Sequence, residues 1–218
     1  MTINSYFDNV YLINLERRKD RLEWVSNELK KYGITFQRFN AIDGLYFEDY
    51  VKYDEETAEK MRWTGGAAAL VETTQLILLD AIEKKYDKIL ILEDDIIFNP
   101  SINSIFEQTY TTIPSDWETL YFGALHRKPY EPINNFLAKV EKCYCCHCYA
   151  IHSSIFKLML ELIRKKEKPI DEYTSADIQP RGRSYCFMPN LVYQKTDYSD
   201  IGYKCAAHSA LWTNLVYE

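Results

Sequence analysis

Three consecutive carboxylates, Glu93, Asp94 and Asp95, interrupt an otherwise apolar stretch and are the residue types best suited to chemistry in this chain. The aliphatic run Ile89–Leu92 precedes them, and apolar residues resume at Ile96. Adjacent carboxylates repel one another and resist burial, so their position beside a buried strand calls for a compensating charge. A bound divalent cation supplies such a charge. The structural alternative is a capping cluster at a strand–turn junction, in which each acid is solvated or paired.

A second group of polar residues is expected at the same place. The apolar run Val10–Leu15 predicts a buried strand, whose end carries Asn14, Glu16 and Arg17. In open α/β sheets, ligands bind beyond the carboxyl ends of the strands. Oxygen-only ligands select magnesium or manganese over zinc, and these ions keep open positions for the phosphates of a substrate. A nucleotide diphosphate would bridge such a metal and the arginines of this edge.

The elements that position these residues follow from the apolar spacing. Helices are predicted at 21–33, 64–86 and 153–166, with Thr64 and Ser153 or Ser154 as N-caps. Strands are predicted at 34–39, 88–98, 118–125, 143–152 and 184–194. Residues 45–62 show no clear period and are interpreted as a loop near the site. This alternation indicates one α/β domain, residues 1–218, with a central, mostly parallel sheet flanked by helices.

Composition argues against several classes of function. The chain has 218 residues, a formal net charge of −6 and 47% apolar residues, which is ordinary for a globular protein. An acidic chain of this kind is a poor candidate for binding nucleic acid. The sequence contains no apolar run long enough to span a membrane and no signal-peptide pattern near its start. We therefore expect a cytoplasmic location without a membrane span.

Four of the six cysteines lie in the segment CYCCHCY, at Cys143, Cys145, Cys146 and Cys148. Zinc sites prefer paired cysteines separated by a long gap, and this segment lacks that arrangement. We interpret the segment as a buried strand that uses cysteine as a small apolar residue. The alternative is a metal or redox cluster.

Several motifs, taken in order, resemble glycosyltransferase family 25, which contains bacterial lipooligosaccharide galactosyltransferases and procollagen galactosyltransferases. The family opening I-N-L-x-R-R-x-x-R is matched by INLERRKDR, and its a-[IV]-D-G element is matched by AIDG. Its G-x-x-x-x-x-L helix and its L-E-D-D element are matched by GGAAALVETTQLIL and LEDD. WETLYFGAL, YAIHSSIFKLM, PIDEY and QKTDYSDI correspond to later elements. The order and spacing hold over about residues 9–201.

The resemblance implies a GT-A-type nucleotide-sugar-binding fold, a UDP-sugar donor (most often UDP-galactose), a divalent metal and inversion at the transferred sugar. One departure concerns the long helix, where the family usually carries a Ser-His pair and this sequence has Glu72, Thr73 and Thr74. The contact made there with donor or acceptor is expected to differ, which leaves the particular sugar open.

The acidic residues receive roles from the same resemblance. Glu93, Asp94 and Asp95 look like the DXD-type element of this fold, with Asp95 as the main manganese ligand. Glu93 or Asp94 would contact the metal or the donor ribose. Asp200 would be a third metal ligand or a structural cap. His208 is the histidine that we would test as a metal ligand.

The nucleotide is expected at the end of the first strand. The positions where the family holds it are Asn14, Leu15, Arg17 and Arg21. Arg17 or Arg21 would bind a phosphate through two hydrogen bonds, or belong to a solvated face of the helix start. Charge runs that open a helix commonly form a solvated face, and this is our interpretation of Arg18 and Lys19. Asp43 in AIDG would bind the nucleotide or serve as a turn residue.

Inverting transfer requires a general base that takes the proton of the acceptor hydroxyl. Asp171 in PIDEY is the candidate, and Glu172 is the second choice. The alternative is that both are surface acids on a loop.

The sequence therefore predicts a metal-dependent inverting glycosyltransferase. It would move a hexose, galactose or glucose, from a UDP-sugar to a hydroxyl on a glycan or on a hydroxylated protein side chain. Two rivals stay open: a catalytically silent relative that binds glycan or nucleotide, and a metal-dependent phosphohydrolase. The missing Ser-His pair supports the first. The second needs a nucleophilic Asp or a dinuclear ligand set with histidines, and neither pattern is evident.

Overall fold

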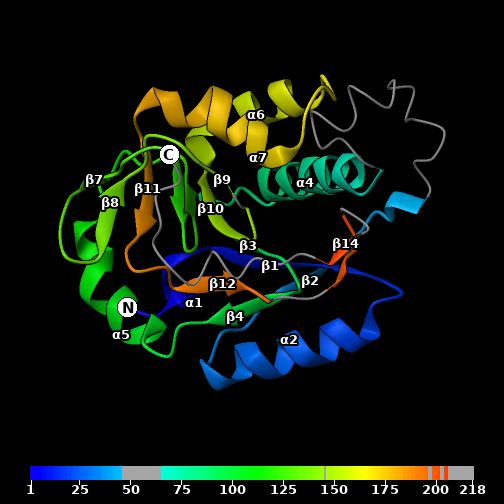
Figure 1. Ribbon diagram of the computed structural model, residues 1–218, viewed down its shortest axis with the longest axis horizontal. Coiled ribbons are helices and arrows are strands. Elements are labelled where there is room, and N and C mark those ends of the chain that lie inside the picture. The colour runs from blue at the N-terminus through cyan, green and yellow to red at the C-terminus, as the bar shows by residue number, and fades with distance from the viewer. Residues whose placement is uncertain (46–64, 145, 196–197, 202–203, 206–218) are drawn as a thin grey trace.

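The computed structural model describes residues 1–45, 65–144, 146–195, 198–201 and 204–205. These residues form a central β-sheet with helices on both faces (Figure 1). Within them, the largest sheet has eight strands in the order β2-β1-β3-β10-β5-β11-β8-β7. In that order the strands are Gln37–Ala41, Asn9–Leu15, Lys88–Leu92, Cys148–His152, Thr119–Tyr121, Ser184–Phe187, Leu137–Lys139 and Glu131–Pro132.

Parallel and antiparallel pairings occur in different parts of this sheet. β1 pairs in parallel with β2 and β3, and β11 pairs in parallel with β5. β10 runs antiparallel between β3 and β5. The segment 143–152, predicted as one strand, supplies two, because β9 (Cys143–Tyr144) pairs instead with β6 (Leu125–His126). The predicted α/β class, with helices flanking a central sheet, is confirmed.

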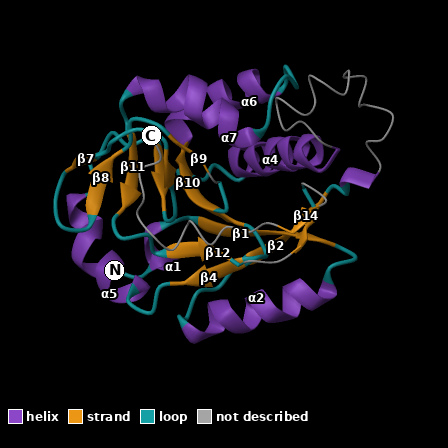
Figure 2. Ribbon diagram, viewed as in Figure 1, coloured by secondary structure: helices purple, strands orange, loops and turns teal. Residues whose placement is uncertain are grey.

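The sheet is apolar on both faces because successive side chains of a strand point in opposite directions. In β1, Tyr11 and Ile13 belong to one core cluster, whereas Val10 and Leu12 belong to the other. Figures 1 and 2 show the helices that cover these faces. The first face is covered by α4 (Gly65–Glu83), α6 (Phe156–Ile163) and α7 (Ile170–Tyr173), and the second by α1 (Ile3–Tyr6), α2 (Lys19–Lys31) and α5 (Ile102–Thr109).

The stretch 88–98 forms two strands rather than one. β3 ends at Leu92, and β4 (Ile96–Phe98) leaves the large sheet to pair antiparallel with β12 (Val192–Gln194). The three carboxylates therefore occupy the turn between strands of two different sheets. A second short pair, β13 (Tyr198–Ser199) and β14 (Lys204–Cys205), lies farther along the chain.

Some element boundaries differ from the prediction. The second strand is shifted from 34–39 to Gln37–Ala41. α6 is not capped by Ser153 or Ser154; a 3-10 turn precedes it, and the His152 side chain accepts a hydrogen bond from the Ser154 amide at 3.2 Å. Thr64, the loop 45–62 beyond its first residue, and His208 lie outside the described residues.

α4 is, within the described residues, the one helix whose length and composition would allow it to cross a membrane. The mean hydropathy of its most apolar window is 1.3, and 56% of that window is buried inside the protein. Ile77, Leu78 and Ala81 on its buried side contribute to the core on the first face of the sheet. Packing against the sheet accounts for the apolar character of this helix.

The side chains of Cys143, Cys146, Cys148 and Cys186 are buried. Burial raises the pKa of Cys186 to about 12. The pKa of Cys148 is also raised, by burial first and then by the nearby charge of Glu93. A raised pKa disfavours the thiolate that metal binding and redox chemistry require. Burial of these side chains agrees with their interpretation as small apolar residues, whereas Cys145 lies outside the described residues.

His126 makes the stability of the core depend on pH. Its side chain is buried, with Nε2 3.6 Å from the Cys186 sulfur, and desolvation lowers its pKa from 6.5 to about 4. Between these values the unfolded chain binds a proton that the folded chain does not. The neutral His126 side chain therefore makes its full contribution to the free energy of unfolding above pH 6.5. This contribution is lost as the pH falls towards about 4.

We expect this group to remove roughly 3 kcal/mol of unfolding free energy at about pH 4 relative to about pH 8. Urea unfolding of the wild type and of His126→Gln at both pH values measures the effect. The variant should show a smaller acid loss, and equal losses in both proteins would contradict the assignment.

Candidate active site

Most of the predicted site residues line one cavity beyond the carboxyl ends of β1 and β3; Arg17, Asp43, Asp171 and Glu172 are not part of its lining. Its walls come from four separate segments of the chain. They are the end of β1 (Ile13, Asn14, Leu15), the acidic turn (Glu93, Asp94, Asp95), the first turns of α4 (Gly66, Leu70, Thr73) and the segment Ser199, Asp200, Ile201. Arg21, Ala41, Ile42 and Gly44 complete the lining. Strands that run in parallel end at the same edge, which is why residues so distant in sequence meet here.

Asp94 is held by a chain of polar contacts that starts on β2. Arg38 Nε donates to Asn14 Oδ1 at 3.0 Å, and Asn14 Nδ2 donates to Asp94 Oδ2 at 2.8 Å. Arg21 Nη1 donates to Asp94 Oδ1 at 3.1 Å. Burial nevertheless raises the pKa of Asp94, against the lowering effect of Asn14 and Arg21. Both carboxylate oxygens are therefore fixed in a partly desolvated position.

Arg21 is the central cation of the site. Its Nη1 lies 3.1 Å from an oxygen of Asp94, 3.7 Å from Asp95 and 3.8 Å from Asp200. Arg21 is 8% exposed, so these ion pairs form where water screens little. α2 positions the residue, because Arg21, Val25 and Leu29 recur on its buried side. One guanidinium thus meets carboxylates from the acidic turn and from the segment around Asp200.

Asp95 also ties the acidic turn to the late part of the chain. Its backbone oxygen accepts from the Lys195 amide at 2.6 Å, and its Oδ2 accepts from Gln194 Nε2 at 3.1 Å. Gln194 closes β12, which pairs with β4 directly after the acids. The small β4–β12 sheet therefore fixes the direction of the Asp95 side chain.

Glu93 carries the strongest electrostatic conflict in the site. Desolvation, and then the charges of Asp95, Asp94 and Asp171, raises the pKa of its carboxyl well above the usual range, and Arg21 opposes this only partly. Its backbone amide donates a hydrogen bond to the His147 backbone oxygen at 2.9 Å, which holds the Glu93 backbone next to the other carboxylates. Added positive charge at this position would relieve the conflict.

Asp200 and Asp43 are joined to each other by Arg17, which lies between β1 and α2. Arg17 lies with Nη1 2.9 Å from Asp200 and Nε 2.6 Å from Asp43. Burial tends to raise the pKa of Asp43, but the hydrogen bonds from Arg17 and the Leu45 amide, with the charge of Arg17, outweigh it and lower the pKa.

The assignment of Arg18 to a solvated face is wrong. It forms ion pairs with Asp20, at 2.9 Å, and with Asp200. α2 begins at Lys19, so Arg18 lies just before the helix and turns towards the cavity. Lys19 is exposed, as predicted.

Gly66 allows the segment around Asp200 to approach α4. A Cβ on Gly66 would lie 2.6 Å from the Ile201 Cα and 2.8 Å from the Asp200 backbone oxygen. These contacts are too close for any side chain larger than hydrogen. The glycine therefore lets Asp200 reach the arginines at the end of β1.

The proposed base residues lie on α7 rather than on a loop. Asp171 is close enough to the acidic turn for its charge to act on Glu93. Glu172 Oε2 lies 3.5 Å from the Tyr144 hydroxyl. The structure thus brings Asp171 towards the predicted metal ligands and places Glu172 next to the β6–β9 hairpin.

The donor set suits a hard divalent cation only in part. Carboxylate oxygens are the ligands that magnesium and manganese prefer, and three carboxylates approach one guanidinium nitrogen within 3.8 Å. In the part of the chain that the structure describes, no three His, Cys, Asp or Glu side chains are gathered as a ready-made metal site. Arg21 occupies the point of convergence, so a metal would share these acids with it.

Three residues that the sequence analysis did not assign to the site hold the residues that line the cavity. Arg38 and Gln194 orient Asn14 and Asp95, as described above. Thr73 accepts from the Ile42 amide at 3.0 Å and thereby holds the turn that carries Asp43 against α4. Arg38 lies on β2, and its contact with Asn14 depends on the pairing of β2 with β1.

Comparison with known proteins identifies relatives. The family model "Glycosyltransferase family 25 (LPS biosynthesis protein)" matches residues 7–144. A glycosyltransferase 25 family member from Anopheles gambiae is 26% identical over 185 residues, which cover 76% of this chain and 31% of that protein. Human procollagen galactosyltransferase 2 is 25% identical over 139 residues, which cover 58% of this chain and 22% of that protein. The matches span less than a third of the length of these relatives.

Solved structures align with this chain at low sequence identity. A glycosyltransferase involved in the glycosylation of the major capsid of PBCV-1 aligns with a TM-score of 0.44 and 14% identity, over 82% of this chain and 81% of that one. UDP-glucose pyrophosphorylase complexed with UDP-glucose aligns with a TM-score of 0.46 and 9% identity, over 82% of this chain and 89% of that one. The family model covers more than half of the chain and includes β1, α4 and the acidic turn. The predicted resemblance is confirmed, and the chain belongs to glycosyltransferase family 25.

Proposed function

We propose that this chain is a metal-dependent inverting glycosyltransferase that transfers a hexose from a UDP-sugar to an acceptor hydroxyl. Galactose is the first candidate for the hexose because relatives include a procollagen galactosyltransferase. One observation carries the proposal: Asn14, Arg21, Asp94, Asp95 and Asp200 line a single cavity beyond the carboxyl ends of β1 and β3. Parallel strands of this kind bind nucleotides at that edge.

The arginines at the start of α2 are suited to the diphosphate of the donor. Arg17 is partly exposed and holds Asp43 and Asp200 through different nitrogens, so it lies at the rim of the cavity. Arg21 lies deeper, among the carboxylates. We assign the rim to the phosphates and the end of β1, at Asn14 and Leu15, to the nucleoside.

Asp95, Glu93 and Asp200 are the residues that would hold the cation, with Asp94 fixed beside them by Asn14 and Arg21. Manganese or magnesium, when bound, would neutralise the charge that develops on the leaving diphosphate. The raised pKa of Glu93 supports this assignment, because a cation next to that carboxyl removes the repulsion.

Asp171 would act as the general base. Its carboxylate takes the proton of the acceptor hydroxyl while the acceptor oxygen forms a bond to the anomeric carbon of the sugar. The bond between that carbon and the diphosphate oxygen breaks on the opposite face, which inverts the anomeric configuration. UDP leaves with the electron pair of the broken bond.

Asp171→Asn is expected to lower kcat by about a hundredfold, since positioned proton transfer contributes at least that much. The affinity for UDP should stay close to that of the wild type, because the proton transfer concerns the acceptor alone. Initial rates of UDP release with acceptor, together with UDP titration, measure both quantities. Glu172→Gln is the matched control, and a larger rate loss in that variant would move the base role to Glu172.

Incubation with manganese and a panel of UDP-sugars, with and without acceptors, tests the proposal. Release of UDP that depends on one sugar and rises with acceptor is the expected result. UDP-sugar binding without release would identify a catalytically silent protein. Release of inorganic phosphate instead of UDP would identify a phosphohydrolase, and either result would overturn the proposal.

A further inference from the structure

The β6–β9 hairpin presents two cations and an aromatic ring next to α7. Leu125 lies opposite Tyr144 and His126 lies opposite Cys143 in the antiparallel register. His126 and Cys143 are buried, as one side of the hairpin requires. The side chains on the opposite face of the hairpin are half-buried and form its outer side; they include Arg127, Lys142 and Tyr144.

Tyr144 holds both cations in place. The Arg127 guanidinium carbon lies 5.5 Å from the centre of the Tyr144 ring, and Lys142 Nζ lies 5.7 Å from it. Both distances are within the range of cation–π attraction. The Arg127 amide donates to the Lys142 backbone oxygen at 2.8 Å, which continues the hairpin and keeps the two side chains beside each other.

These two cations differ from their basic neighbours in charge balance. Lys128 pairs with Glu141 at 2.6 Å, and Lys168 pairs with Asp177 at 2.6 Å. Within the described residues, no carboxylate forms an ion pair with Arg127 or Lys142. The chain as a whole carries a formal charge of −6, so two neighbouring cations that no described carboxylate neutralises form a local site of positive charge.

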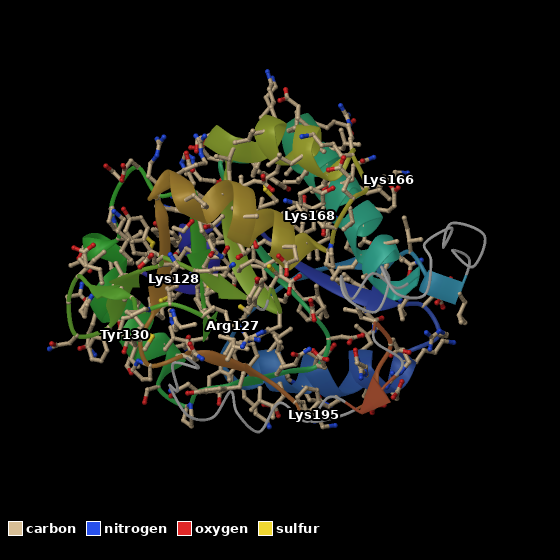
Figure 3. All side chains as sticks on the ribbon, turned by 45° about the horizontal axis from the view of Figure 1, so that its top comes forward. Arg127, Lys128, Tyr130, Lys166, Lys168 and Lys195 are labelled. Atoms are coloured by element: carbon tan, nitrogen blue, oxygen red, sulfur yellow. The ribbon has the colours of Figure 1, made fainter. Side chains whose placement is uncertain are left out.

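The hairpin is connected to the proposed base. The Tyr144 hydroxyl lies 3.5 Å from Glu172 Oε2, and Glu172 is adjacent to Asp171 on α7. Figure 3 shows Arg127 on the face turned to the viewer, with Lys168 and Lys195 on either side of it. Glu172 thereby links the hairpin to the turn of α7 that carries Asp171.

We propose that Arg127 and Lys142 bind a carboxylate or phosphate group of the acceptor, so that the acceptor is an anionic glycan. The inference rests on the proposed function and names the substrate class of that site. Charge-assisted hydrogen bonds from a guanidinium and an ammonium recognise both anions. The same charges disfavour an acceptor that presents an amine at this position. Tyr144 is a positioning residue that holds the two cations at the edge of the site.

The test compares acceptors that share the same terminal sugar and differ in one neighbouring group, which is neutral, carboxylate or phosphate. Transfer by the wild-type chain is measured with the donor that the UDP-release panel identifies. An at least tenfold higher kcat/KM for one or both anionic acceptors is expected, and it should fall with added salt. The carboxylate and phosphate arms distinguish the two sources of the anion. Equal kcat/KM for all three acceptors would overturn the inference.

Variants locate the effect on the hairpin. Arg127→Gln and Lys142→Gln are each expected to reduce the anionic-to-neutral preference by about tenfold, and Arg127→Lys should restore part of it. Lys128→Gln is the matched control, because it removes the same charge from a lysine that is already paired, and the preference should persist. An unchanged preference in Arg127→Gln would also overturn the inference. If no donor is turned over by the wild type, the proposed function fails first; if turnover occurs without preference, only this inference fails.

Discussion

Asp95→Asn is expected to reduce UDP release by about a thousandfold while the protein stays folded. The substitution keeps the shape of a side chain that is buried against Gln194 and Arg21. It removes one negative charge from a cluster in which Glu93 is already destabilised by its neighbours. Stability should therefore stay equal or rise, whereas the affinity for the cation that would neutralise the diphosphate falls.

The measurement is the initial rate of UDP release at saturating manganese, combined with thermal unfolding of the same preparations. Asp116→Asn, at an exposed carboxylate outside the cluster, is the matched control and should keep the wild-type rate. Full activity in Asp95→Asn would remove this residue from the metal assignment. A rate loss that is accompanied by unfolding would instead make Asp95 a structural residue.

Arg21→Gln is expected to lower the free energy of unfolding by about 3 kcal/mol in metal-free buffer. The variant leaves Asp94, Asp95 and Asp200 without the guanidinium nitrogen that lies within 3.8 Å of all three. Removing one partner of a buried ion pair is costly because the remaining charges stay desolvated. Manganese should recover more stability in the variant than in the wild type, because the cation no longer shares the acids with Arg21.

Urea unfolding with and without manganese measures both effects. Arg183→Gln is the matched control: its Nε lies 3.3 Å from Glu118, which keeps a closer ion pair with Arg181 at 2.7 Å. The Arg183 side chain is 43% exposed and Glu118 keeps its ion pair with Arg181, so the loss should stay below about 1 kcal/mol. Equal losses in Arg21→Gln and Arg183→Gln would show that Arg21 is not the central cation of the site.

The part of the fold that depends on local pattern was predictable. The apolar run Val10–Leu15 and the helical spacing of α2 correspond to observed elements within a few residues, because burial imposes a period on each. The direction of β10 was not predictable, because a buried strand has the same apolar sequence pattern whether it pairs in parallel or antiparallel. The departure of β4 into a second sheet was hidden for a similar reason: its partner β12 lies almost a hundred residues later.

In the candidate site, too, the residues identified by local pattern were predicted, and those that depend on tertiary contacts were not. Asn14, Arg21 and the acidic turn were found because strand ends and motif spacing bring them to one edge. Arg18 was misjudged because a charge pattern at the start of a helix is local, whereas its partner Asp200 lies 182 residues away. Arg38 was missed because it acts on Asn14 and touches no residue of the acidic turn through a described hydrogen bond. Contacts of this kind depend on tertiary packing, and no local pattern records them.

Calorimetric titration of UDP into the full chain, with and without manganese, tests the central claim most directly. The account predicts that binding requires the cation and that Asp95→Asn abolishes this requirement together with most of the affinity. Tight binding of UDP in metal-free buffer, unchanged by Asp95→Asn, would contradict it, because the carboxylates beyond β3 would then have no part in holding the nucleotide.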